Sequence, residues 1–401
     1  MSTIVSCRAA AMRESASIAA KARVTELLSR GEQIVDFTLG EPDFDTPAHI
    51  VEAAGKAMRA GETRYTASNG TPALRQAVAE KLRRENGLEY EPSQIVVGCG
   101  AKQIIDMAFA ATINAGDEVI IPAPYWVSYP DLAGFHGART VVVAGEESTG
   151  HKLTPDALAA AISTRTKWLV LNSPNNPSGA VYSAAELGAL GAVLERHPQV
   201  WVLSDEIYEH FVFGSDRPIS VAALGPGISA RTLTVNGVSK TYAMTGWRIG
   251  YGAAPPALAA VMTKLLSQAT TCAPSVSQAA AVAALNGEQS FVRDAAQTYA
   301  ERGAFMARKL QSIPGFRCPD PQGAFYLFPS VRELMGRRTL DGDILSTDEE
   351  VETFLLDEAG VAVVRGSAYG LPGHLRLSFA TTPDKIANGC DRIASAVAGL
   401  R

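Results

Sequence analysis

Lys240 and Arg248 stand eight positions apart in residues 235–248, which read VNGVSKTYAMTGWR. The lysine follows a small-residue turn, and its amine can condense with an aldehyde to form a Schiff base. The arginine is a fixed cation that can hold a phosphate group. Both residues also occur around ordinary surface loops, so this segment alone defines only a candidate site.

Pyridoxal phosphate needs both groups, because its aldehyde condenses with a lysine and its phosphate needs a cation. Asp205 follows the apolar run 200–203, and ligands bind at the carboxyl ends of strands in open α/β sheets. A carboxylate there can keep a pyridine nitrogen protonated, and Tyr208 could donate to the phenolic oxygen of the ring. The alternative for Asp205 is a helix N-cap.

Two further segments follow predicted strands. Asn176 lies in a turn of Asn, Pro and Gly, where it could bond the ring oxygen and a substrate carboxylate, although such clusters are usually plain turns. Trp126 begins a predicted helix and could stack on a flat cofactor, although a lone tryptophan is more often part of the core.

Residues 98–103, GCGAKQ, join a strand to a helix. Backbone N–H groups at a helix start bind anions, so Gly100, Ala101 and Lys102 are expected to form a phosphate cradle. A dinucleotide fingerprint would need a third glycine where Gln103 stands, and the segment is not a Walker A loop.

Arg376 lies in the strictly alternating segment 374–379, where it shares a face with Ser378. It could be a surface arginine, or it could offer a two-pronged donor to an α-carboxylate.

Bulk composition excludes several classes. The 401 residues are 47% apolar and 19% charged, and the formal charge of −5 comes without a basic stripe, which argues against nucleic acid. The five cysteines are scattered without a C-x-x-C pair, which indicates a reducing cytoplasm and no metal site. No apolar run suits a signal peptide or a membrane span. H-E-x-x-H and G-x-S-x-G motifs are absent, so metal-dependent and serine hydrolysis have no support.

Short apolar runs alternate with helical patterns between residues 95 and 235, which predicts a parallel sheet covered on both faces and an α/β fold. A long helix over about 288–312 then leads into a smaller α+β region. We expect an N-terminal arm (1–46) that packs with the small domain, a large domain (47–290) and a small C-terminal domain (291–401).

Together these segments resemble the class I pyridoxal-phosphate-dependent aminotransferases, and more narrowly the bacterial aspartate aminotransferases, over nearly the whole chain. The landmarks are residues 40–47 (GEPDFDTP), Tyr65, 124–129 (PYWVSY), 175–179 (NNPSG), 204–208 (SDEIY), 240–248 and Arg376. The resemblance implies a fold-type I enzyme with a mostly parallel seven-stranded sheet and ping-pong transfer of an amino group.

The resemblance also implies roles at the cofactor. Lys240 would carry the aldehyde and shuttle the proton, and Asp205 would pair with the pyridine nitrogen. The other implied cofactor contacts are Tyr208 and Asn176 on the phenolic oxygen, Trp126 on the ring, and Arg248 with Gly100, Ala101 and Lys102 on the phosphate. Many relatives have a phosphate-binding serine where this chain has Gly237, which leaves more of the anchoring to Arg248 and the backbone.

For the substrate, the resemblance implies that Gly40, Trp126, Asn176 and Arg376 surround the α-carboxylate. Lys102, helped by a hydroxyl near Ser17, would bind a distal carboxylate and favour aspartate and glutamate, unless Lys102 only accompanies the phosphate. Tyr65 would reach the cofactor phosphate of a neighbouring subunit, which implies a homodimer with shared active sites.

Four alternatives stay open at this stage. Related enzymes use aromatic amino acids or prephenate, and the same fold hosts carbon–sulfur lyases and decarboxylases. A ligand-sensing regulator would need a DNA-binding extension that the short N-terminal arm does not offer. A nicotinamide dehydrogenase is suggested only by Gly98-x-Gly100.

Overall fold

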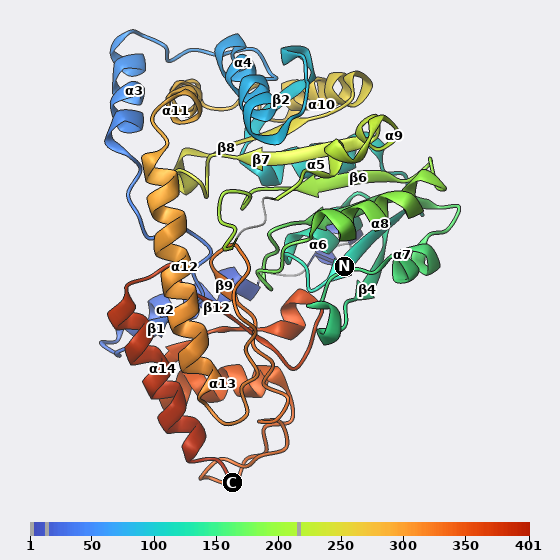
Figure 1. The fold of residues 1–401 in the computed structure, drawn as a ribbon. Coiled ribbons are helices and arrows are strands. Elements are labelled where there is room, and N and C mark those ends of the chain that lie inside the picture. Colours follow the sequence, from blue (N-terminus) through green and yellow to red (C-terminus); the bar gives the residue numbers. More distant parts are fainter. Residues whose placement is uncertain (1–3, 13–15, 215–217) are drawn as a thin grey trace.

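A seven-stranded sheet forms the centre of the computed structural model, which describes residues 4–12, 16–214 and 218–401 (Figure 1). The strand order is β2-β8-β7-β6-β5-β3-β4. The strands are β2 (Ile95–Cys99), β3 (Glu118–Ala123), β4 (Arg139–Ala144), β5 (Thr166–Asn172), β6 (Trp201–Asp205), β7 (Thr232–Gly237) and β8 (Ile249–Ala253). The predicted α/β fold with a mostly parallel seven-stranded sheet is confirmed.

One strand runs against the others. β8 is antiparallel to both of its neighbours, β2 and β7, while the remaining neighbours in the sheet are parallel. The carboxyl ends of β2, β5, β6 and β7 therefore meet at one edge, and β8 begins at that same edge, with Ile249 paired to Cys99. This reversal, which the sequence analysis did not foresee, places Arg248 beside the strand ends.

Helices cover both faces of the sheet. Successive strand residues point to opposite sides, and apolar side chains on both sides pack against helices. Val119 and Ile121 pack in one cluster with Met262, whereas Ile120 between them packs with Leu187 on the other face. The helices of this part are α3 (Ala48–Arg59), α4 (Pro72–Lys81), α5 (Ala101–Thr112), α6 (Ser128–Phe135), α7 (Pro155–Ala161), α8 (Ala184–Glu195), α9 (Pro226–Ser229), α10 (Pro256–Ala269) and α11 (Ser275–Asn286).

Side chains cap the starts of α8 and α7. Ser183 accepts from the backbone of Glu186, whose carboxylate accepts from the Ser183 backbone, and the Thr154 hydroxyl caps α7. Helix α4, which begins at Pro72, ends at Lys81 and continues as a π-helix, η1 (Leu82–Asn86), before Gly87 turns the chain at φ 66°.

The long helix α12 (Ser290–Gln311) runs from beside α11 down to α14 in the lower part of Figure 1. The smaller part contains β9 (Tyr326–Leu327), α13 (Asp348–Ala359), β10 (Val361–Ala362), β11 (Val364–Arg365), β12 (Leu375–Ser378) and α14 (Pro383–Ala398). Residues 361–365 form two separate strands, because β10 pairs with β1 (Val35–Asp36) and β11 pairs with β12.

The N-terminal segment contains the helices α1 (Cys7–Ala10) and α2 (Ala16–Ser29), and β1 joins it to the smaller part through parallel pairing with β10. The three domain bounds stay predictions. Among the helices of the described residues, none is both long and apolar enough to cross a membrane.

Candidate active site

A cavity of about 320 Å³ opens at the edge where the strands end. Its walls come from the sheet edge, the start of α5, the segment before α6, the smaller part and the N-terminal segment. The residues that line it are Gly40, Ala101, Lys102, Ile105, Trp126, Val127, Ser128, Tyr129, Asn172, Asn176, Asp205, Ile207, Tyr208, Ser239, Lys240, Thr245, Arg248, Tyr326 and Arg376.

Most of the predicted site residues therefore share one cavity. Two whose side chains are described do not line it. Gly100 lies just behind it, against Arg248. Tyr65 is 87% exposed and lies elsewhere on the chain's surface. The side chain of Ser17 lies outside the described residues.

Asp205 is held as a buried carboxylate at the end of β6. Its Oδ2 accepts from the hydroxyl of Tyr129 at 2.6 Å, and its Oδ1 accepts from the backbone N–H of Ile207. Burial raises the pKa of Asp205 to about 6, and the Tyr129 hydrogen bond opposes that rise. The group is thus ionised at neutral pH and can face a protonated ring nitrogen. It caps no helix, since a turn follows β6.

Lys240 lies opposite, and its ammonium donates to the carbonyl of Gly40. Burial lowers the pKa of Lys240 to about 8, an effect that the Glu41 carboxylate opposes. A lysine in water keeps its proton to above pH 10. Near neutral pH a useful fraction of Lys240 is consequently the free amine, the form that attacks an aldehyde and accepts a proton.

The predicted phosphate cradle would consist of a helix start and a cation. The first amides of α5, at Ala101 and Lys102, have no carbonyl one turn earlier to bond. Arg248 donates to the carbonyls of Cys99 at 3.2 Å and Thr245 at 2.9 Å, which fixes its guanidinium beside them. Gly100 has φ 86°, and any Cβ there would collide with that guanidinium.

Arg376 is 2% exposed and crosses the gap between the two parts of the chain. It donates to Asn176 Oδ1 at 3.2 Å and to the carbonyl of Thr38, and it lies over the ring of Tyr326 at 4.6 Å. Its Nε is buried and has no acceptor among the described residues. The side chain is therefore fixed in place with donor capacity left over, as a carboxylate-binding arginine should be.

Two tyrosines of the site were not predicted as functional. Tyr129 supports Asp205, and Tyr326 of β9 shares a hydrogen bond of 2.9 Å with the hydroxyl of Tyr208. Burial raises the pKa of Tyr208 well above its ordinary value, so it remains a neutral donor. Tyr129 belongs to the PYWVSY landmark, whereas no pattern in the sequence indicated that Tyr326 of β9 would lie at this cavity.

Position 237 leaves no room for the serine that many relatives carry. A Cβ at Gly237 would lie 2.9 Å from the carbonyl oxygen of Ile249 and 3.0 Å from Cα of Gly250. The glycine lets β7 and β8 pack closely at this end.

Comparison with known proteins agrees with this architecture. Residues 32–393 match the family model described as aminotransferase class I and II. An aspartate/prephenate aminotransferase from Cereibacter sphaeroides is 47% identical over 98% of both chains. The crystal structure of the aspartate aminotransferase from Rhizobium meliloti has a TM-score of 0.97 at 45% identity and full coverage of both chains. The Thermus thermophilus aspartate aminotransferase with maleate has a TM-score of 0.92 at 39% identity, covering 99% of this chain and 100% of that one.

The chain therefore belongs to the class I and II aminotransferases, and it is a transaminase. Class I members use pyridoxal 5′-phosphate. The residues present fit that group: a buried amine for the aldehyde, an ionised carboxylate for the ring nitrogen, and a glycine-lined helix start with an arginine for the phosphate.

We expect Gly100→Ala to weaken cofactor binding at least tenfold, because the added methyl group displaces Arg248. Titration of apoenzyme with the cofactor, followed by fluorescence, measures the Kd. Gly116→Ala is the matched control, since Gly116 also has positive φ (90°) but no atom within 4 Å of an added Cβ. It carries the backbone strain of about 1 kcal/mol without the collision. Equal Kd values for the two variants would contradict the cradle.

The pKa of Lys240 predicts how cofactor capture depends on pH. Capture needs the free amine, so its rate should rise between pH 6 and 8 and level off above pH 8–9. With an amine of the ordinary lysine pKa, the rate of capture would keep rising to about pH 10. Stopped-flow absorbance of apoenzyme mixed with cofactor gives the profile, and a simple alkylamine in the same buffers corrects for ionisations of the cofactor. A corrected profile still rising tenfold per unit at pH 9 would contradict a lowered pKa.

Proposed function

We propose that the chain transfers the amino group of a dicarboxylic amino acid, aspartate or glutamate, to a 2-oxo acid. The observation that carries this is the charge of the cavity wall. Lys102, Arg248 and Arg376 all line it, and among the described residues none has a carboxylate at salt-bridge distance. Arg376 is buried, whereas Lys102 and Arg248 are exposed, and Arg248 lies close enough to Lys102 for like-charge repulsion. Three like charges on one wall without carboxylate partners indicate that the ligands bring the anions.

Three anionic groups match these three cations. Arg248 with the start of α5 serves the cofactor phosphate, and Arg376 serves the substrate α-carboxylate. Lys102 remains for a second carboxylate. Its ammonium lies 4.9 Å from the centre of the Trp126 ring, which orients it over the cavity. Burial, with Arg248 nearby, lowers the pKa of Lys102, and a bound carboxylate would reverse that shift.

The names of relatives support the same substrate class. Two of the relatives above are aspartate aminotransferases, and the Thermus protein was crystallised with maleate, a dicarboxylate. The Cereibacter relative is named for prephenate as well as aspartate. Prephenate also carries two carboxylates, so the same wall charge favours it as a second substrate over phenylalanine, which has one carboxylate.

Each side chain of the cavity has a role that follows from its position. Arg376 holds the α-carboxylate and thereby points the Cα–H bond toward Lys240. Nζ of Lys240, as the free amine, accepts that proton as a general base and can donate it again as a general acid. Asp205, held by Tyr129, would keep the ring nitrogen of the cofactor protonated, and Tyr208 and Asn176 would donate to its phenolic oxygen. Bound pyridoxal phosphate supplies the electron sink that no side chain offers.

We also propose that the chain forms a homodimer. Tyr65 is 87% exposed and does not reach the cavity of its own chain, as expected of a residue that serves the phosphate of a partner. The five cysteines are all unpaired, which supports a reducing compartment such as the cytoplasm.

An amino-donor panel tests the function. With 2-oxoglutarate as acceptor, aspartate should be used with a kcat/KM at least 100-fold above alanine and phenylalanine, measured by coupling oxaloacetate to NADH oxidation or by direct glutamate assay. Lys240→Ala should lose the visible absorbance of bound cofactor together with all transamination. Release of pyruvate or ammonia without glutamate would indicate a lyase instead, and full activity of Lys240→Ala would end the proposal.

Lys102 is tested separately. Lys102→Ala should raise the KM for aspartate at least tenfold and leave the KM for alanine and phenylalanine within about twofold. The reason is that only aspartate has a second carboxylate, and the substitution removes the partner of that carboxylate. Prephenate, assayed as amino acceptor, should be affected like aspartate. If all substrates weaken equally, Lys102 serves the cofactor phosphate and not the substrate.

A further inference from the structure

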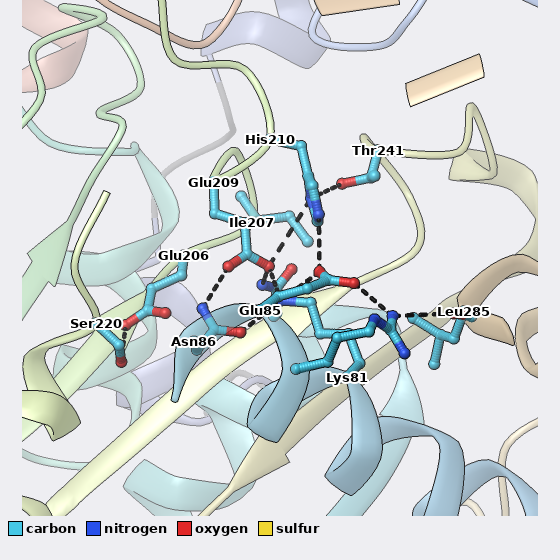
Figure 2. Close-up of polar contacts among 12 residues, drawn as sticks. Lys81, Glu85, Asn86, Glu206, Ile207, Glu209, His210, Ser220, Thr241 and Leu285 are labelled. Carbon is cyan, nitrogen blue, oxygen red and sulfur yellow. Dashed lines mark hydrogen bonds and ion pairs between the residues drawn. The ribbon is translucent and has the colours of Figure 1, made fainter. Parts of the chain in front are cut away.

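A partly buried polar cluster, part of which is shown in Figure 2, lies outside the cavity. Its members come from the end of α4, from η1, from the turn after β6 and from the segment around Lys240. They are Lys81, Glu85, Asn86, Glu209, His210, Asn236 and Thr241. None of them lines the cavity.

Glu209 is the centre of one half of the cluster. The side chain of Lys81 is 1% exposed and donates to the Glu209 carboxylate, which is 7% exposed. The same carboxylate accepts from Nδ2 of Asn86 at 2.6 Å and from Nδ2 of Asn236. Asn236 in turn accepts from the backbone N–H of Gly237 at 2.7 Å. Glu209 thus joins the turn that carries Tyr208 to the backbone just before Lys240.

His210 makes a second connection on the other side of Lys240. Its Nε2 lies 3.1 Å from Oε2 of Glu85, and its Nδ1 lies 3.1 Å from Oγ1 of Thr241, the residue directly after the lysine. A carboxylate only accepts, so Nε2 carries the proton, and in the neutral ring Nδ1 accepts the hydroxyl hydrogen of Thr241. Figure 2 shows His210 standing between Thr241 and Glu85.

Two other readings of the cluster fail on its geometry. Glu85, Glu209 and His210 have ligand atoms within 4.8 Å of one another, but the ammonium of Lys81 already lies beside both carboxylates, 3.5 Å from that of Glu85. The order hydroxyl, imidazole, carboxylate is that of a nucleophile relay. Thr241 is only 1% exposed, however, so its hydroxyl cannot meet a substrate.

We propose that Glu209 and His210 are positioning residues that fix Lys240 relative to Asp205 and Tyr208. Each follows Tyr208 in sequence and bonds to a segment flanking Lys240, one before it and one after it. The ring must sit between these groups, and proton transfer loses rate steeply when the amine moves by a fraction of an ångström. The inference rests on the proposed function for its kinetic readout only.

The test uses full-length holoenzyme with conservative changes at Thr241. Thr241→Val removes the hydroxyl at nearly constant volume, and Thr241→Ser keeps it as the matched control. His210→Phe, which removes both ring nitrogens, is measured in parallel in case the valine variant does not fold. The readouts are kcat and KM for aspartate, the pH midpoint of the visible absorbance of bound cofactor, and the Tm of the apoenzyme.

Thr241→Val and His210→Phe should lower kcat at least fivefold with KM within twofold, and should displace the absorbance midpoint by at least 0.3 pH unit. Thr241→Ser should match the wild type within twofold. A lower Tm with unchanged kcat and midpoint would show a purely structural cluster and overturn the proposal. If the wild type does not use aspartate, the proposed function fails, while the absorbance midpoint still decides whether the positioning exists.

Discussion

Burial of the Lys240 amine is the interaction on which the rest of the site depends. Desolvation lowers its pKa to about 8, which makes the free amine available where an exposed lysine would stay charged. That effect requires walls on every side. β7 supplies the segment that carries the lysine, the N-terminal segment supplies the Gly40 carbonyl, and the smaller part supplies Tyr326 and Arg376.

The sheet brings these groups together for a topological reason. Parallel strands end at the same edge, so Asp205 and the Lys240 segment are neighbours although they are far apart in sequence. The reversed β8 adds Arg248 at its start, and the close packing of β8 on β7 is what Gly237 and Gly250 permit. The reversed strand thus places at this edge a cation that could hold a phosphate, whereas a parallel strand would have placed it at the opposite edge.

Sequence reasoning found residues whose signal is local and missed those whose role arises from packing. Lys240, Asp205 and Asn176 follow apolar runs, so both strand and strand end are visible in the sequence. Tyr326 looks like any aromatic residue of a core strand, and only the approach of β9 to Tyr208 gives it a place at the cavity. Lys81 looks like a surface lysine of a helix, yet its partner lies 128 residues away. Local patterns contain no information about such contacts.

Two groups of charged side chains in this chain differ in whether their charges are paired within the chain. Around Glu209 the carboxylate has three donors from the chain itself, and the Lys81 ammonium has a carboxylate and an amide as acceptors. Around the cavity, Lys102, Arg248 and Arg376 have carbonyls, an amide and aromatic rings, but no carboxylate among the described residues. A cluster whose opposite charges are paired within the chain keeps the backbone in place. A group of positive side chains without carboxylate partners instead favours the binding of an anion. Transamination needs both kinds of group. Binding of the anionic ligands is productive only if the Lys240 amine keeps its position beside them.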